Sequence, residues 1–416
     1  RMFLIGAAGF TAASAACGLA PSTGFLVGAR LAQGLCGAMM IPQGLGVIRE
    51  VFPADELPKA FGLFGPVMGS AAMIGPILGG ALIALDLFGS GWRLVFLINV
   101  PLGIAAVIGA AVLLPVTRTR HADSLDLGGA VLAAVGAVAI VYPLIQGREL
   151  GWPAWTYASM GASVVLFALL ARHLRRRKAA GRDPLIEPSI FTHRGYTAGA
   201  LVLMLYFGGM VGSMLTLTLF LQLGEGFSAI HAGLTLAPFA LGTAITAPFS
   251  AQKMASIGGR TLIQIGGLVS MVGYTAVALI VASTGHASTW ALIGPLLVIG
   301  MGMGLFVVPV FDTIISAVTD AETGSASGVL NAIQQLGGGI GVAVLGTIFF
   351  TVLGHEGFAP ALTHSIWWQV GLLGAMLALT PLLPARAREP ESARADGDSE
   401  AASDDTRERL AETVAA

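Results

Sequence analysis

The candidates for chemistry in this sequence are a few polar side chains that interrupt long apolar stretches. Arg30 lies about six residues into one such stretch, roughly 9 Å along a helix that rises ~1.5 Å per residue. Burial of its guanidinium in a membrane would cost at least ~2.5 kcal/mol, so the residue needs a function or a partner. Gln33 continues the same helical face and Gln43 lies nearby. These residues either line a cavity that handles substrate or protons, or Arg30 extends toward the headgroups or pairs with a backbone carbonyl.

Asp312 is the second candidate, because it is the only acidic residue well inside a predicted membrane span. A carboxyl group in a low-dielectric cavity can hold a proton near neutral pH, as a proton carrier must. Only a few residues separate Asp312 from the next loop, so a carboxylate solvated at the interface is the alternative. One proton that crosses the membrane supplies ~2.3 kcal/mol per 100 mV, enough for a roughly fifty-fold solute gradient, so a single carboxylate would suffice. We interpret Asp86 and Glu225, at predicted outer span ends, as solvated caps.

A third group of candidates is a stripe of aromatic, methionine and serine side chains on one predicted helix. Its members are Tyr206, Met210, Ser213 and Phe220. Pliable methionine beside aromatic rings suits a promiscuous apolar site, although such stripes are equally typical of a helix core. On another predicted span we interpret Asn331, Gln334 and Gln335 as interhelical hydrogen-bonding residues.

Composition places these candidates in a membrane protein. Of 416 residues, 55% are hydrophobic and only 11% are charged, and the mean hydropathy is +0.81, whereas a soluble chain carries about 25% charged residues. The net charge of −1 argues against nucleic acid as a partner. Neither the cysteines nor the histidines have a spacing that predicts a metal site or a disulfide framework. The cysteines are Cys17 and Cys36, and the histidines in or beside predicted outer loops are His231, His286, His355 and His364.

Twelve stretches are apolar and long enough to cross ~30 Å of hydrocarbon, which takes ~20 residues of helix. They are residues 2–20, 24–48, 60–85, 94–115, 127–146, 155–173, 196–222, 231–251, 261–283, 290–315, 326–353 and 366–384. Loops on one side hold most of the Lys and Arg, including the run 172–182, whereas the other side holds only Arg93 and Arg148. This bias in Lys and Arg predicts that both termini are cytoplasmic. We interpret the run 172–182 as part of the same charge bias and as a lipid-headgroup contact, rather than as a binding site. The polar, acidic segment 385–416 predicts a disordered cytoplasmic tail.

The glycine-rich span 60–85 is predicted to present a surface that moves. Small residues recur every three or four positions from Gly62 to Gly79, which puts them on one helix face. In lipid the helix stays formed despite its glycines, because unsatisfied backbone groups are costly there. A face of glycines lets the backbone of a second helix approach closely. Ordinary static packing is the alternative. The residues assigned to this conformational seam are Gly65, Pro66, Gly69, Gly75, Pro76 and Gly79.

Several motifs resemble those of a known transporter family. The Gly-Pro-rich span looks like the antiporter signature of the major facilitator superfamily, and Arg30-Leu-Ala-Gln-Gly34 followed by Pro42 resembles the fourth-helix motif of its drug exporters. Further segments are similar to its fourteen-helix drug:proton antiporter branch. They are Gly91–Gly103, Asp126–Gly128, Gly151–Trp152, Gly324–Gly328 and Gln335–Gly338.

The resemblance implies an all-α, polytopic major-facilitator helix bundle in which the twelve spans are the family's helices three to fourteen. Residues 1–115 would form the N-terminal half, 116–174 an inserted helix pair, and 175–384 the C-terminal six-helix half. The family's first two helices would then be missing, and Arg1 leads straight into apolar sequence without a signal peptide, as expected of a fragment. The seam should meet the second helix of the other half, residues 231–251, whose small residues also share a face.

The leading hypothesis is a secondary active transporter that exports small, largely apolar compounds or drugs by proton antiport with alternating access. Proton-coupled or facilitated uptake on the same scaffold is the alternative, which the antiporter signature disfavours. A membrane-embedded enzyme or receptor is a remote alternative, because no intramembrane nucleophile–base pair, acidic cluster or phosphate loop supports catalysis. We expect a monomer in the cell membrane with no metal, and with no cofactor because the proton gradient drives it.

Overall fold

The computed structural model describes residues 2–51, 75, 78–86, 89–113, 126–319 and 322–384, and every element in these residues is helical. The predicted all-α fold is therefore confirmed. The helices are α1 (Met2–Gly18), α2 (Thr23–Val51), α4 (Leu94–Leu97), α5 (Asn99–Leu113), α6 (Leu127–Glu149), α7 (Ala154–Ala179), α8 (Arg194–Leu219), α9 (Ala229–Ile257), α10 (Gly259–Thr284), α11 (Thr289–Ile315), α12 (Thr323–Glu356) and α13 (Phe358–Leu379). Shorter segments are the 3-10 turns η2 (Gly91–Arg93), η3 (Pro188–Thr192) and η6 (Thr380–Leu382), and the π-helical turn η4 (Phe220–Gly224) that continues α8.

Nine helical segments in the described part of the chain are long and apolar enough to cross a membrane, and α1 is apolar but shorter. The chain is therefore a multi-pass membrane protein. Most of the predicted span 60–85 lies outside the described residues, and residues 78–85 form a helix at its end. The predicted tail, residues 385–416, also lies outside them.

Two loops that the sequence predicts are single-residue turns in the structure. Gly258 joins α9 to α10 with φ +92°, and Gly357 joins α12 to α13 with φ +91°. Glycine adopts this backbone region without a steric penalty, so a helix can end and the next begin at once. The predicted start of the last span, residue 366, is wrong because α13 already begins at Phe358. Pro360 is tolerated there because N–H groups in a first helical turn have no intrahelical partner.

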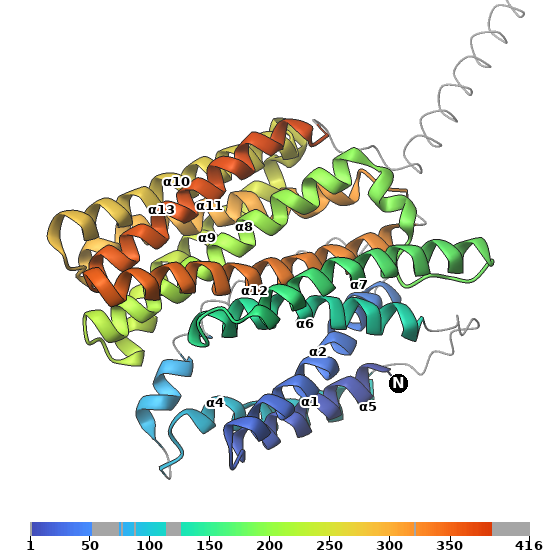
Figure 1. The fold of residues 1–416 in the computed structure, drawn as a ribbon, viewed down its shortest axis with the longest axis horizontal. Coiled ribbons are helices and arrows are strands. Elements are labelled where there is room, and N and C mark those ends of the chain that lie inside the picture. Colours follow the sequence, from blue (N-terminus) through green and yellow to red (C-terminus); the bar gives the residue numbers. More distant parts are fainter. Residues whose placement is uncertain are drawn as a thin grey trace, which may run out of the picture.

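Helices α8 to α13 pack into one block, in which α8 and α12 lie side by side and α11 contacts α9 and α10 (Figure 1). Glycines bring these backbones together. A Cβ on Gly341 of α12 would overlap the carbonyl oxygen of Gly208 in α8, and one on Gly300 of α11 would overlap that of Phe239 in α9. In lipid, helices associate through such close packing rather than through a hydrophobic driving force. The largest fully buried side chains of the block include Tyr196, Tyr206, Phe220, Phe306 and Phe349.

The pair α6–α7 packs against this block through α12, where a Cβ on Gly339 would lie 3.5 Å from Val141 of α6 (Figure 1). The pair exposes apolar side chains along its length, including Val131 and Val164, which a bilayer would cover. The N-terminal group is built around α1, which contacts α2, α4 and α5.

Candidate functional site

The first candidate site is a polar network around Arg30 of α2. Arg30 Nη1 donates to Gln33 Oε1 at 2.9 Å, and the guanidinium carbon lies 4.3 Å from the centre of the Phe96 ring in α4. Gln33 Nε2 donates to Ser14 Oγ of α1 at 2.9 Å, and Asn99 Nδ2 of α5 donates to the same oxygen at 3.1 Å. Ser14 Oγ donates to the carbonyl oxygen of Phe96 at 3.0 Å. Four helices therefore hold one arginine in place.

This network explains how a charged residue is retained in an apolar helix. Gln33 and Ser14 are 3% and 0% exposed, so their polar atoms need the partners that they have. Arg30 itself is exposed, and an amide oxygen and an aromatic face hold its head. A guanidinium has five N–H donors, of which Gln33 takes one. Such a preorganised charge can bind a polar substrate group or balance a carboxylate that changes its protonation.

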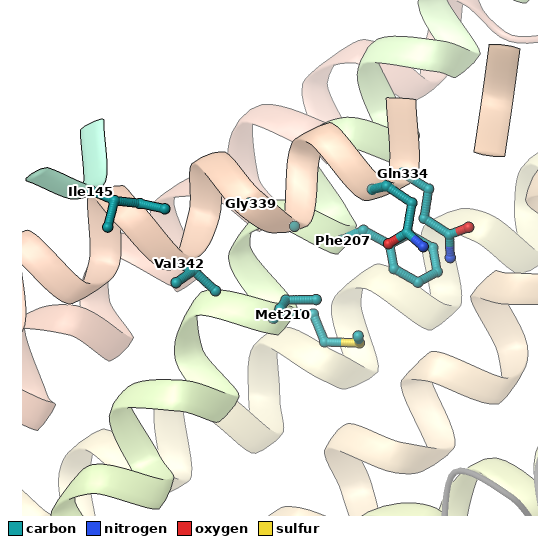
Figure 2. A pocket seen from close by; sticks show the side chains of 9 residues that line it. Ile145, Phe207, Met210, Gln334, Gly339 and Val342 are labelled. Carbon is teal, nitrogen blue, oxygen red and sulfur yellow. The ribbon is translucent and has the colours of Figure 1, made fainter. Parts of the chain in front are cut away.

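The second candidate site is a pocket of about 380 Å³ between α6, α8 and α12 (Figure 2). It is lined by Ile145, Phe207, Met210, Val211, Gln334, Gln335, Gly338, Gly339 and Val342. The carboxamides of Gln334 and Gln335 are the only polar side chains in that lining, and none of the lining residues is charged. A pocket of this size and polarity suits a small, largely apolar molecule that carries a few hydrogen-bonding groups.

The predicted stripe on α8 divides in the structure. Met210 lines the pocket, whereas Tyr206 is 2% exposed and lies inside the C-terminal block. The Tyr206 ring stacks on Phe306 of α11 with centroids 3.7 Å apart, and its hydroxyl shares a hydrogen bond of 3.0 Å with Ser270 Oγ of α10. In this structure Tyr206 holds α8 against α10 and α11, and its contact with a substrate stays a prediction.

Asp312 lies in the last turn of α11, three residues before the helix ends at Ile315, and the residue is exposed. Among the residues that the structure describes, its carboxylate has no hydrogen-bond donor and no ion-pair partner. A carboxylate in this position is open to solvent or to a mobile ligand. Its role as a proton carrier stays a prediction, and Arg30 and Gln33 are the predicted site residues that the structure brings into direct contact.

The helix that contains the described end of the predicted seam approaches α9 next to the seam residues and not at them. Gly75 and Gly79 are described, but a Cβ on either would meet nothing within 4 Å. The close approach occurs at the adjacent Gly80, where a Cβ would lie 2.7 Å from the carbonyl oxygen of Ala229. A cleft of about 520 Å³ opens beside this contact, lined among others by Gly79, Gly80, Met214, Thr218, Gly233 and Ala237. Gly65, Pro66, Gly69, Pro76 and the side chain of Gln43 lie outside the described residues.

Comparison with known proteins decides the family. A model of the Major Facilitator Superfamily matches residues 1–342. The chain belongs to this superfamily. Members of this superfamily are transporters and not enzymes. Within the described residues, no group of three or more His, Cys, Asp or Glu side chains could hold a metal ion.

Relatives of this superfamily member include a transporter and a resistance protein. The "Probable actinorhodin transporter" of Streptomyces coelicolor is 42% identical over 360 residues, which are 86% of this chain and 62% of that protein. The chain thus spans less than two thirds of this relative's length. The "Puromycin resistance protein pur8" of Streptomyces alboniger is 32% identical over 395 residues, 92% of this chain and 77% of that protein. A solved structure of an auto-inhibited POT family peptide transporter has a TM-score of 0.63 at 16% identity, over 93% of this chain and 83% of that chain, a likeness of fold alone.

Four polar residues of this major facilitator protein belong to the candidate sites because of how its helices pack. Ser14 and Asn99 complete the Arg30 network. Asn99 is the only amide side chain in its apolar span, a signal that could have found it, whereas Ser14 shares its span with Thr11. Gln334 and Gln335 line the pocket, although the sequence favoured interhelical hydrogen bonding for them. A carboxamide on a helix suits either role, and its neighbours decide which one it has.

Proposed function

We propose that this protein exports small, largely apolar compounds by proton antiport across the plasma membrane. The observation that carries the proposal is the pocket between α6, α8 and α12, whose lining is apolar apart from two carboxamides. The amides of Gln334 and Gln335 can orient a neutral ligand, while Met210 and Phe207 adapt to ligands of different shape. The names of the relatives, an actinorhodin transporter and a puromycin resistance protein, support export as the direction.

Alternating access would take place between the N-terminal helices and the C-terminal block, with residues 116–174 as an inserted pair. The close approach of Gly80 to Ala229 supports a contact surface on which the two halves tilt. A glycine at such a point lets two backbones meet without a side chain that would lock them. The cleft beside this contact supplies room for the halves to separate.

Arg30 and Asp312 are the residues to which we assign proton coupling. The Arg30 network supplies a positive charge in a fixed position. The exposed Asp312 carboxylate, with no partner in the described part of the chain, is free to take up and release a proton. The bias of Lys and Arg between the loops supports cytoplasmic termini. We expect each monomer to transport by itself.

The test is to express the full-length gene in an efflux-deficient bacterium and to measure sensitivity to puromycin and other apolar antibiotics. Export predicts increased resistance, and inside-out vesicles with an acidic lumen should accumulate the compound until a protonophore removes the gradient. Gln334→Leu combined with Gln335→Leu should change which compounds are exported, whereas Gln252→Leu, which removes an exposed amide near the end of α9, should not. Accumulation inside intact cells would instead indicate uptake and overturn the proposal.

A further inference from the structure

The C-terminal end of α7 carries a basic run that the structure divides into two faces. On the face toward the rest of the protein, His173 Nε2 lies 2.8 Å from Asp126 Oδ1, and Arg177 Nη1 lies 3.7 Å from the same oxygen. Lys178 Nζ donates to Glu187 Oε1 at 2.7 Å. These basic residues are therefore engaged by carboxylates of this chain.

Asp126 fixes the orientation of this helix end. Its side chain is 1% exposed and accepts hydrogen bonds from the backbone nitrogens of Gly129 at 2.9 Å and Leu185 at 3.1 Å. Burial raises the pKa of Asp126, but the hydrogen bonds from Gly129, His173 and Leu185 outweigh burial and lower the pKa to about 2. The carboxylate is therefore charged at neutral pH and joins the start of α6, the end of α7 and the segment that follows α7.

The opposite face of the same helix end presents three arginines. Arg172, Arg175 and Arg176 are exposed, and among the described residues none of them has a hydrogen-bond or ion-pair partner. Their spacing of three and four residues places them on one side of α7. The contacts of His173 and Arg177 with Asp126 fix which way this side faces, so the three guanidiniums point away from the protein together.

The position of the three arginines along α7 matches a membrane surface. Arg172 is eighteen residues after Ala154, about 27 Å along the helix, close to the ~30 Å thickness of the hydrocarbon. Near the other end of α7, the rings of Trp155 and Tyr142 lie 5.8 Å apart, as in the aromatic belts at membrane interfaces. Between the two ends, Val164 and Val165 are exposed and apolar.

We propose that Arg172, Arg175 and Arg176 form a binding surface for the phosphate of an anionic phospholipid headgroup, which revises the interpretation of the whole run 172–182 as a general headgroup contact and not a binding site. The guanidinium fork matches phosphate oxygens and donates paired hydrogen bonds to them, and three guanidiniums on one face give a local positive field. The lipid tails would lie along the exposed apolar face of α6 and α7. The headgroup is held in the leaflet that the C-terminal end of α7 reaches.

The test measures lipid binding to the purified full-length protein by native mass spectrometry, with phosphatidylglycerol and phosphatidylcholine compared at equal chain length. We expect preferential binding of phosphatidylglycerol, a loss of about fivefold in Arg175→Gln, and a loss of about a hundredfold when all three arginines become Gln. Lys178→Gln removes the same charge from the same helix turn, but from a side chain that is already paired with Glu187, and should change the affinity less than twofold. Unchanged melting temperatures would show that the variants fold.

Three results would overturn this assignment. Equal losses of phosphatidylglycerol affinity in Arg175→Gln and Lys178→Gln would mean that any positive charge near the membrane attracts the lipid, and that the three arginines form no specific surface. Equal binding of the two lipids would remove the role of the net negative headgroup. Displacement of the lipid by millimolar inorganic phosphate would make the surface a site for free phosphate. None of these results depends on transport, so they leave the proposed export function untouched.

Discussion

The N-terminal helices and the C-terminal block fill their interiors with different kinds of side chains. Around α1, small apolar side chains such as Ala7 and Cys17 are buried beside Ser14 and Gln33, whose side chains are hydrogen-bonded to one another. In the block from α8 to α13 most buried side chains belong to one apolar cluster, and a few buried hydroxyls within it are bonded to one another, such as those of Tyr206 and Ser270. The first arrangement can hold a charge such as Arg30, and the second can form an apolar wall.

The two regions also differ in how they can respond to strain. The C-terminal block is joined by glycine contacts between backbones, as at Gly208 and Gly341, and such contacts have one close-packed arrangement. The N-terminal group has such a contact too, since a Cβ on Gly6 of α1 would lie 3.1 Å from the carbonyl oxygen of Cys36 in α2, but it is also joined by hydrogen bonds between side chains, which can exchange partners. We infer that the block acts as the rigid wall of the pathway and that the Arg30 network is the part that reorganises.

The largest expected effect tests the rigid wall. Gly341→Leu should destabilise the protein by about 3 kcal/mol or more, because a side chain there meets the backbone of Gly208 and would force α8 and α12 apart. Thermal unfolding in detergent measures this cost. Gly354→Leu on the same helix is the control, since a Cβ there meets nothing within 4 Å. Equal stability of the two variants would show that the block tolerates separation.

The next effect concerns the charged network of the other region. Arg30→Ala should lower the efflux rate roughly ten- to a hundredfold, the range expected when a hydrogen bond to a charged group worth ~1.5–3 kcal/mol is lost. Arg30→Lys keeps the charge but not the planar guanidinium fork, so its efflux rate should lie between the rates of Arg30→Ala and the wild type. Initial rates in vesicles, normalised to protein amount, measure this. Full activity of Arg30→Ala would contradict a role for the network in transport.

A third prediction concerns the helix pair α6–α7, which lies outside both regions. Because the pKa of Asp126 falls from 3.8 to about 2 on folding, its contribution to stability is present above pH 4 and is lost as the pH drops toward 2. The contribution is roughly 2 kcal/mol. Asp126→Asn should therefore lower the melting temperature at pH 7. Between pH 4 and pH 2, the melting temperature of this variant should fall less than that of the wild type. A variant as stable as the wild type at pH 7 would refute the role of this carboxylate.

The smallest effect concerns the contact between the two regions. Gly80→Leu should slow efflux about fivefold, because the new side chain meets the carbonyl oxygen of Ala229. Gly79→Leu and Gly75→Leu should slow efflux less, because a Cβ at either position meets nothing within 4 Å in this conformation. The same vesicle assay ranks the three variants. If Gly79→Leu or Gly75→Leu is the most harmful, the seam meets another helix face during the transport cycle, and the contact at Gly80 is not where the halves move.

Much of the fold could be predicted from residues near one another in the chain. Apolar stretches of sufficient length predict the helices, and a single helical turn places Arg30 beside Gln33. The turns are harder to predict. Residues 354–365 contain glycine, proline and histidine, which is the composition of a loop. Gly357 alone reverses the chain there, and this depends on one backbone angle that composition does not reveal.

Hydropathy and helical period are local properties, so the order of residues is enough to predict a helical membrane protein and the few polar residues in its spans. The packing of the helices, in contrast, buries Tyr206, leaves Met210 in the lining of a pocket, and brings Gln334 and Gln335 into the same lining. It also decided which of the basic residues of α7 are engaged by carboxylates and which point outward. These outcomes depend on which helix packs against which face, and in lipid that choice follows from shape and hydrogen bonding between helices rather than from hydrophobicity along the chain.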